Sequence, residues 1–486
     1  MLNRRERFWI SILAFALWVS PAWAQQNDPR VNPPIAPVAP LSSGESSSKP
    51  PANSSGNTAD GPQTLIPDTR PLSGAEMLTL GSVGRARSYF LPSFQFTQVG
   101  DTNARSTADG SKIDAASIVS GRIALQRVWR RYQLTADYTG GRSLYNNNST
   151  LNASFHQFGV TQAIAGRRWS LQLSDHFSYL PESSSATAGF GTPSSLFPGL
   201  GARLDLSLPN LNPTLTPNQS ILTGRAARIS NAFVGELLYR SNSRSSYTLT
   251  GSYGILHYLD SGFINSSNAI VQVGYNRALT AQDTIAFTYG VSFFWFQGTD
   301  AAIDNHVFQI AYGRRVTGRL AFELSGGPQI NRRFLNPGAK SDTQANWSLS
   351  SSLRYRYPRT ELAVNYTRYV TGGAGVLLGA ETDEIRMTVA RQLSRMWSGS
   401  MNAGYAHNAP LRLVTGGPSA SAFNYIHAGF SLDRPLGRYT GIFVHYDLQR
   451  QDSATAFCFG GTCGRALLRH YFGVGFNWHF RPVEID

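Results

Sequence analysis

Much of the chain alternates large apolar residues with small or polar ones. Within residues 283–296, for example, Ile285 and Phe287 share one parity, and Ala286 and Thr288 share the other. Successive side chains of a strand point to opposite faces, so a period of two predicts strands. A run of roughly 18 or more apolar residues, which a membrane-spanning helix needs, does not occur after residue 24.

About 18 such segments follow one another from residue 87 onward, with boundary errors of roughly two to four residues. Short connections such as Arg130-Arg131 alternate with long ones, as expected when hairpin turns lie at one end of a barrel and larger loops at the other. The expected strands are 88–99, 116–129, 132–145, 149–164, 168–180, 227–241, 245–259, 267–280, 283–298, 304–316, 319–333, 344–357, 360–371, 382–394, 396–407, 421–433, 438–450 and 466–481.

The chemistry of the second face separates a membrane barrel from a soluble sandwich. A sandwich carries Lys, Glu and Arg on its solvent face, whereas here that face is mostly Ser, Thr, Gly, Asn and Gln, which suits a water-filled interior. We therefore predict an all-β fold: a transmembrane antiparallel β-barrel of about 18 strands, within a range of 16 to 20, preceded by a disordered N-terminal arm.

The first 86 residues differ in character from the rest. Residues 1–24 combine a basic start, a short apolar core and a small-residue cleavage pattern at Ala22 and Ala24, which predicts a secretory signal peptide. Residues 25–86 are rich in Pro and Ser and predict a disordered periplasmic linker, with a short ordered lead-in within 66–81. The barrel is expected to span 87–486, in the outer membrane of a Gram-negative cell.

Composition narrows the function. Charged residues make up 15% of the chain, against about 25% in ordinary soluble domains. The formal net charge is +14, but no basic run with interleaved aromatic residues indicates nucleic-acid binding. No pattern of metal or cofactor ligands is evident, and we predict neither.

The end of the chain carries a strong strand signal. In YFGVGFNWHF, large apolar residues alternate with small or polar ones, and in a closed barrel this strand must pair with the first. The architecture and this segment resemble Gram-negative outer-membrane β-barrels of the porin-like superfamily. The resemblance implies that the last strand is recognised by the barrel-insertion machinery, through Phe472, Phe476, Trp478 and Phe480. The chain departs from that pattern by adding RPVEID.

Aromatic and charged residues are distributed as expected for contact with lipid. Tryptophan prefers the membrane interface, and we predict an aromatic girdle with Trp129, Trp169, Trp397 and Trp478 at the periplasmic rim and Trp295 and Trp347 toward the outer rim. The short turns are rich in Arg. The long connections contain acids that either bind cations bridging lipopolysaccharide phosphates or are ordinary loop charges: Asp101, Asp109, Asp114, Asp260, Asp300, Asp304, Asp342, Glu381 and Asp383.

Two sets of residues are expected to shape the pore. Charged residues of inward parity would set selectivity, or form structural ion pairs along the wall: Arg122, Asp137, Glu323, Arg354, Arg356, Glu384, Arg386 and Asp433. The segment 181–226 is far longer than common loops and carries much apolar surface. It is expected to fold into the lumen or over its mouth; the alternative is a loop packed over the rim or against a partner. Its candidate constriction residues are Leu196, Phe197, Leu200, Arg203, Leu204 and Asp205.

The two cysteines, Cys458 and Cys463, bracket a Gly-Gly pair. In an exported protein this spacing predicts a small disulfide-closed loop, with a pair of free thiols as the alternative.

We consider three functions. The first is a porin-like channel for passive diffusion of small polar solutes, narrowed by the 181–226 loop. The second is the barrel component of an export system, for example for polysaccharide, whose N-terminal arm binds a periplasmic partner. The third is an outer-membrane hydrolase using residues such as His176, His257, His445 and Asp447, although no GxSxG or HExxH motif is present. We predict a channel and not an enzyme.

The long loop generates the first testable prediction. Deletion of residues 195–215 should raise single-channel conductance, because it removes the segment expected to narrow the pore. Planar-bilayer recordings measure this directly, and an unchanged conductance would remove the loop from the conduction path.

Overall fold

The structure is a computed structural model that describes residues 71–76, 88–105, 113–181, 212–216, 226–334, 341–373, 375, 377–411, 422–459 and 462–485. The chain divides into two units, Met1–Gly61 and Pro62–Asp486, and all described residues belong to the second. The signal peptide predicted at 1–24 and most of the linker predicted at 25–86 lie outside the described residues.

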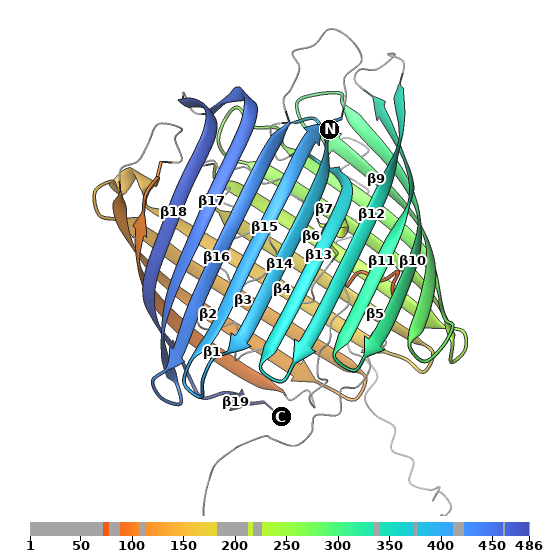
Figure 1. Ribbon diagram of the computed structural model, residues 1–486, viewed down its shortest axis with the longest axis horizontal. Helices are drawn as coiled ribbons and strands as arrows, with labels where there is room; N and C mark the ends of the chain where they lie inside the picture. The colour runs from red at the N-terminus through yellow and green to blue at the C-terminus, as the bar shows by residue number, and fades with distance from the viewer. Residues whose placement is uncertain are drawn as a thin grey trace, which may run out of the picture. The chain divides into compact units, whose positions relative to one another are not determined.

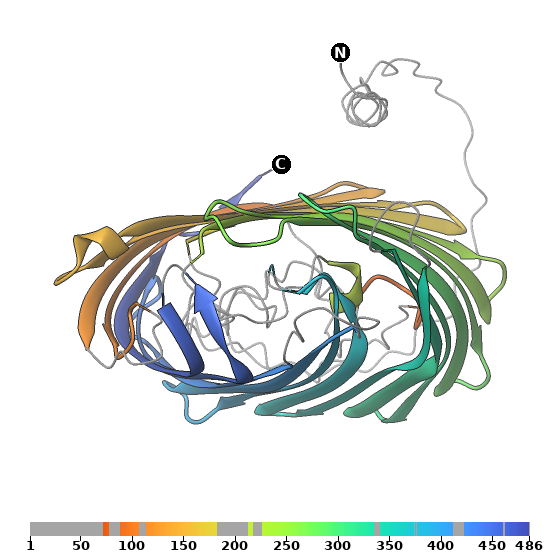
Figure 2. The ribbon, with the colours of Figure 1, turned by 90° about the horizontal axis from the view of Figure 1, so that it is seen from above.

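The described chain forms one antiparallel sheet that closes on itself (Figures 1 and 2). From β1 to β18 each strand pairs with its neighbours in sequence, and β1 also pairs with β18. The first nine strands are β1 (Tyr89–Asp101), β2 (Asp114–Val128), β3 (Tyr132–Tyr145), β4 (Ala153–Ala165), β5 (Trp169–Leu180), β6 (Arg228–Arg240), β7 (Ser245–Tyr258), β8 (Ser266–Ala278) and β9 (Asp283–Phe296).

The second half continues in the same order. Its strands are β10 (Ala302–Thr317), β11 (Leu320–Phe334), β12 (Asp342–Tyr357), β13 (Thr360–Thr371), β14 (Ala380–Gln392), β15 (Ser398–Pro410), β16 (Phe423–Pro435), β17 (Thr440–Phe459), β18 (Thr462–His479) and β19 (Val483–Glu484). Single 3₁₀ turns occur at η1 (Ser149–Leu151) and η3 (Pro213–Leu215). Among the described residues, no helix has the length and apolar character needed to cross a membrane.

The prediction of an all-β antiparallel barrel with about 18 strands is confirmed. The largest boundary difference is at the last hairpin, where β17 runs to Phe459 rather than to residue 450, and β18 begins at Thr462 rather than at 466. The extra residues pair past a register shift between Asp452 and Phe457, and Cys458 lies opposite Cys463. The cysteine side chains lie outside the described part, so the disulfide stays a prediction.

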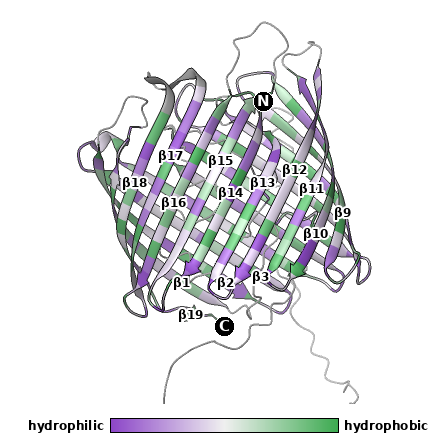
Figure 3. Cartoon of the chain, viewed as in Figure 1, coloured by the Kyte–Doolittle hydropathy of each residue, from purple (hydrophilic) through white to green (hydrophobic). Residues whose placement is uncertain are grey.

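Alternation along the strands becomes an inward and an outward face. On β1, Gln95 and Thr97 are each 3% exposed, whereas Phe94 and Phe96 between and beside them are each 41% exposed. The inward positions are therefore polar and covered, and the outward positions are large and apolar. Figure 3 shows the resulting alternation of hydrophobic and hydrophilic residues along the wall.

The terminal strand closes the barrel as expected. Phe476 pairs with Phe96, and Trp478 pairs with Phe94. Phe472, Phe476 and Phe480 are exposed on the outer surface, and the Trp478 and Phe480 rings lie 4.1 Å apart. The RPVEID tail resumes the pairing, because Val483 and Glu484 of β19 lie opposite Phe90 and Tyr89 of β1.

The predicted girdle residues lie near strand ends. Trp129, Trp169, Trp397 and Trp478 lie at the end of the wall with the short turns, and Trp295 and Trp347 lie toward the opposite end. Several are covered by arginine: Arg127 stands over Trp129 at 4.9 Å, and Arg368 stands over Trp347 at 4.4 Å. In such a cation–π contact, the positive guanidinium is attracted to the face of the indole ring.

A buried ion pair links β1 to β18, the two strands whose pairing closes the barrel. Asp101 ends β1 with 0% exposure, and both of its oxygens accept hydrogen bonds from Arg469 of β18. The backbone amide of Asn103 also donates to Asp101, at 3.0 Å. Asp101 was expected among the outer acids that bind cations; this expectation is wrong, since its inward parity and its partner arginine remove it from that surface.

This pair generates a prediction for stability. Arg469→Gln should destabilise the barrel by about 3–5 kcal/mol, because it leaves the buried Asp101 carboxylate without its partner charge. Urea unfolding of the protein in lipid vesicles, followed by tryptophan fluorescence, measures the change.

The matched control is Arg450→Gln in the same hairpin. Arg450 pairs with Asp452 at 2.8 Å, but the two side chains are 56% and 36% exposed, so its loss should cost less than about 1 kcal/mol. Equal effects of the two substitutions would contradict a special role for the seam pair.

Candidate functional site: the barrel lumen

The predicted selectivity residues all occupy inward positions on their strands. Their neighbours two residues away on the same strand include buried polar residues such as Ser120, Thr139, Ser325 and Ser352. The set comes from six strands and is Arg122, Asp137, Glu323, Arg354, Arg356, Glu384, Arg386 and Asp433.

Several of these charges are neutralised within the wall. Arg122 Nε of β2 lies 2.6 Å from Asp137 Oδ2 of β3, and both side chains are less than a tenth exposed. Arg386 Nε of β14 donates to Glu384 Oε1 at 2.5 Å on the same strand, and Tyr369 donates to the other oxygen of Glu384 at 3.3 Å. For these four residues, the structure therefore shows the second of the two predicted roles, which is structural ion pairing along the wall.

A short piece of the N-terminal region lies inside the barrel. Residues Pro71–Glu76, here called the lumenal segment, are drawn in orange within the wall in Figure 2. Ser73 forms its centre: the backbone amide donates to Asn276 Oδ1 at 3.1 Å, and the hydroxyl lies 2.5 Å from Thr248 Oγ1. The carbonyl of Ser73 accepts from Gln272 Nε2 at 3.1 Å.

The flanking residues extend this attachment. The amide of Ala75 donates to Glu236, and the Ala75 side chain packs against Val234 and Ile270 of the wall. The sequence placed these residues in a linker with a short ordered lead-in. Because they satisfy their backbone groups on the wall, the lumenal segment is part of the barrel interior.

Two wall glycines make room for the lumenal segment. A Cβ on Gly274 would stand 2.2 Å from the Ser73 Cβ, and a Cβ on Gly313 would stand 2.8 Å from a Leu72 methyl group. Both distances are shorter than any real Cβ contact, so a side chain at Gly274 would displace Ser73. Gly290, also inward, differs: a Cβ there would meet nothing closer than 3.9 Å.

Part of the long 181–226 loop also lies in the lumen. The amide of Asn212 donates to the carbonyl of Ala75 at 2.7 Å, and Leu215 of η3 is 1% exposed and packs against Val234 and Ile270. The described part of the loop thus lies inward and touches the lumenal segment. The predicted constriction residues Leu196, Phe197, Leu200, Arg203, Leu204 and Asp205 lie outside the described residues.

A second inward loop was not predicted. The connection from β13 to β14, residues 372–379, is here called the cap loop. Gly373, Gly375 and Gly379 have φ values of 84°, 75° and 83°, which favour glycine because a Cβ is unfavourable there. A Cβ on Gly375 would also meet the Tyr258 ring at 2.4 Å. The signal that could have predicted it is the segment TGGAGVLLG, which consists almost entirely of glycine and apolar residues.

The cap loop reaches apolar residues on distant strands. The carbonyl of Gly375 accepts from the Ile264 amide at 2.8 Å. Leu377 packs with Phe423 of β16, and Leu378 packs against a cluster that includes Phe294 and Ile303. The loop therefore joins opposite parts of the wall through the lumen and narrows it near the ends of these strands.

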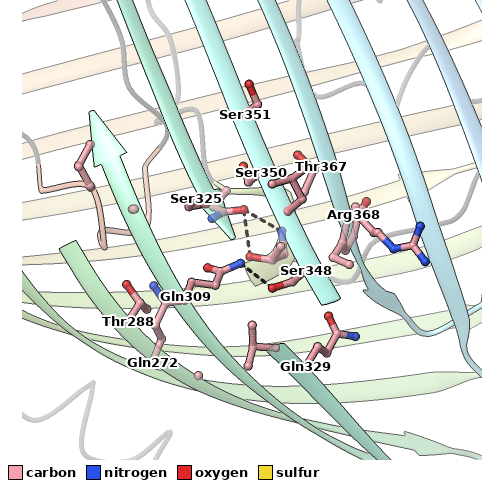
Figure 4. Close-up of a pocket in the computed structure, with 18 of the residues that line it drawn as sticks. Gln272, Thr288, Gln309, Ser325, Gln329, Ser348, Ser350, Ser351, Thr367 and Arg368 are labelled. Carbon is pink, nitrogen blue, oxygen red and sulfur yellow. Dashed lines mark hydrogen bonds between the residues drawn. The ribbon is translucent and has the colours of Figure 1, made fainter. Parts of the chain in front are cut away.

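Beside the lumenal segment lies a polar cavity, here called the amide chamber, with a volume of about 90 Å³. Its wall comes from β8 to β13, and Leu72, Asn212 and Thr214 close one side. Figure 4 shows Gln272, Gln309 and Gln329 among the hydroxyl side chains that line it.

The residues weighed for hydrolysis lie on β5, β7 and β17. His445 and Asp447 of β17 both face inward and are nearly buried, and Asp447 Oδ1 is 3.7 Å from His427 Nε2. Among the described residues, no hydrogen bond joins a Ser or Thr hydroxyl to His176 or His445.

Comparison with known proteins finds similarity at the level of structure alone. No protein-family model and no curated protein matches the chain. The structure is similar to Pseudomonas aeruginosa OccK2 (OpdF), at 8% identity over 81% of this chain and 98% of that one, with a TM-score of 0.41. It is also similar to P. aeruginosa OpdK with vanillate, at 8% identity over 80% of this chain and 99% of that one, again with a TM-score of 0.41.

The glycine pair generates a prediction. Gly274→Ala should release the lumenal segment and raise single-channel conductance, because the new methyl group occupies the position of Ser73. Each hydrogen bond lost is worth about 1 kcal/mol, so losing those of Ser73 is enough to shift the segment largely to the released state.

Gly290→Ala is the matched control, since it adds the same methyl group to the same lumen where space exists. It should leave conductance unchanged. If both variants conduct like the parent protein in planar bilayers, the lumenal segment does not restrict the pore.

Proposed function

We propose that the protein is a porin-like channel of the Gram-negative outer membrane for passive diffusion of small polar solutes. The observation that carries the proposal is a closed sheet whose outer face is apolar and whose inner face is polar. Outward residues such as Phe94, Val271 and Ile310 are 41%, 50% and 58% exposed. Such a surface suits hydrocarbon outside and water inside.

The contents of the lumen favour small solutes over polymers. The cap loop extends through the interior from β13 and β14 toward β7 and β9. The lumenal segment lies against the inner face of the wall from β6 to β10. A solute must pass beside these elements, so the free passage is narrower than the wall alone would leave. This supports a diffusion channel rather than the conduit of an export system.

The lumenal ion pairs support weak charge selectivity. Rings of unpaired charge make a pore selective for one sign of ion. Here Arg122 is held by Asp137, and Arg386 is held by Glu384.

The location and partners belong to the same proposal. A signal peptide at 1–24 would direct export, and the terminal strand with its outward Phe472, Phe476 and Phe480 would be read by the barrel-insertion machinery. The outer rim would meet lipopolysaccharide. At this rim Arg368 forms ion pairs with Glu381 at 2.7 Å and with Asp383 at 3.1 Å. Arg368 thus already balances two of the acids that were expected to bind bridging cations.

The test is ion conductance of the purified protein in planar bilayers, together with selectivity variants. Arg122→Gln should shift the reversal potential toward cation selectivity, because it leaves the Asp137 charge in the lumen without its partner. A unit charge at about 4 Å in water is worth about 1 kcal/mol, so the permeability ratio should change by up to about fivefold.

Asp137→Asn should shift selectivity the opposite way, and the double variant should return close to the parent value. A parent protein that folds and inserts but conducts no ions would refute the channel. Identical reversal potentials in all four proteins would place the pair away from the conduction path.

A further inference from the structure

The outer surface of the wall carries a repeated pairing of tyrosine with histidine. Tyr138 Oη lies 2.9 Å from His156 Nδ1, and Tyr446 Oη lies 2.7 Å from His470 Nδ1. Each tyrosine is the seventh residue of a strand that starts at a short turn, β3 or β17, and each histidine lies opposite the ninth residue of that strand. A strand needs about 9–11 residues to cross the hydrocarbon, so both pairs lie near the outer boundary of the apolar band.

Below the first pair, toward the short turns, the outward surface is aromatic. Phe158 of β4 lies opposite Tyr138 of β3 and opposite Phe177 of β5. All three side chains are exposed on the outer face. They form a continuous apolar row across three strands, which suits contact with lipid chains.

One step further from the short turns, the same surface becomes polar. His156 lies opposite Gly140 of β3 and Tyr179 of β5. Gly140 leaves the space in which Tyr138 reaches the imidazole, because a Cβ there would collide with the phenol. Beyond Gly140, the next outward residue of β3 is the exposed Arg142. We call Tyr138, Arg142, His156 and Tyr179 the first outer site.

The first outer site has hydrogen-bond donors to offer. Among the described residues, the side chain of His156 has its hydrogen bond through Nδ1, to Tyr138. When the phenol donates to Nδ1, the proton of the neutral imidazole is on Nε2, which can then donate. Arg142 forms no ion pair within the described part of the chain. A guanidinium beside an imidazole N–H, above an apolar row, fits an anionic group attached to hydrocarbon chains.

The hairpin of β17 and β18 repeats this arrangement. Tyr446 lies opposite Phe430 on one side and Phe472 on the other. Arg450 follows Tyr446 by four residues, the same spacing as in the first outer site. In this second outer site, however, Arg450 already pairs with Asp452 at 2.8 Å, so its charge is partly balanced.

A third pair provides an internal contrast. Tyr289 Oη of β9 lies 2.9 Å from His306 Nδ1 of β10, and Tyr289 is again the seventh residue of its strand. Phe293 stands where the other two sites have arginine. The residue opposite Phe293 is Asp304, which lies opposite Arg332 on its other side. This pair therefore has the phenol and the imidazole, but a carboxylate in place of an available cation.

We propose that the first outer site binds a phosphorylated lipid of the outer leaflet, namely the lipid A part of lipopolysaccharide. The phosphate lies between Arg142 and His156, and the acyl chains cover Phe158 and Phe177. Arginine binds phosphate through parallel N–H donors. The inference rests on the outer-membrane location proposed above and is independent of what the lumen conducts.

Titration of the purified mature protein in detergent with lipid A tests the proposal, with bound lipid counted by native mass spectrometry. EDTA is present, so that no divalent cation can link a phosphate to an acid such as Asp304. Bisphosphorylated lipid A should bind at least about tenfold more tightly than dephosphorylated lipid A, because the charge-assisted hydrogen bonds need the phosphate. Equal binding of the two would overturn the proposal.

Two further probes separate the possible sources of phosphate. Phosphatidylglycerol should bind at least about fivefold more weakly than lipid A, since its phosphodiester carries one charge and a phosphomonoester carries about −1.5 to −2. Inorganic phosphate at the same concentration should not displace lipid A, because it lacks the acyl chains that cover the aromatic row. Equal binding of phosphatidylglycerol, or displacement by inorganic phosphate, would overturn the assignment to lipid A.

Substitutions place the effect at the first outer site. They are made in an Arg450→Gln background, which removes the cation of the second outer site. There, Arg142→Gln and His156→Phe should each raise the half-saturating lipid A concentration by about tenfold, since each removes a hydrogen bond to a charged group. Both side chains are exposed, and Arg142→Gln gives an independent result if His156→Phe fails to fold.

The matched control is His306→Phe, which makes the same change in a tyrosine–histidine pair that lacks the arginine. It should leave lipid A binding unchanged, and equal losses in His156→Phe and His306→Phe would overturn the site. Failure of the channel proposal is distinguishable, because it would show as absent ion conductance with lipid A binding intact. Normal conductance without phosphate-dependent binding would refute the lipid site alone.

Discussion

The structure depends on one constraint: the backbone groups of a sheet surrounded by hydrocarbon must all be paired, so the sheet has to close. The pairing of β1 with β18 meets it, over Ser93–Asp101 and Tyr471–His479. Closure fixes which face of every strand is inside, because the alternation of side chains then has a common direction. The buried ion pair between Asp101, the last residue of β1, and Arg469 of β18 stabilises this pairing further.

Closure also creates an interior that the chain itself partly fills. The lumenal segment and the cap loop both reach strands remote from their own position in the sequence, and both do so where glycine leaves space for a close approach. Gly274 accommodates Ser73, and Gly375 accommodates the Tyr258 ring. The width of the passage is therefore set by these internal elements as much as by the number of strands.

The same interior contains both compensated charges and hydrogen-bonding side chains. Arg122 with Asp137 on β2 and β3, and Arg386 with Glu384 on β14, form ion pairs. The amide chamber lies among β8 to β13, where glutamine and hydroxyl side chains dominate.

The sequence by itself determined the wall: strands with an apolar and a polar face, their order, the short and long connections, and the inward parity of residues such as Arg122 and Glu384. Alternation is a local property, because successive side chains of an extended backbone point to opposite faces of the sheet. Only the tertiary structure decided that Ser73 bonds to Asn276 and Thr248, at sequence separations of 203 and 175, and that the cap loop turns inward. These contacts depend on which strands face each other across a closed barrel, and a period of two carries no information about that.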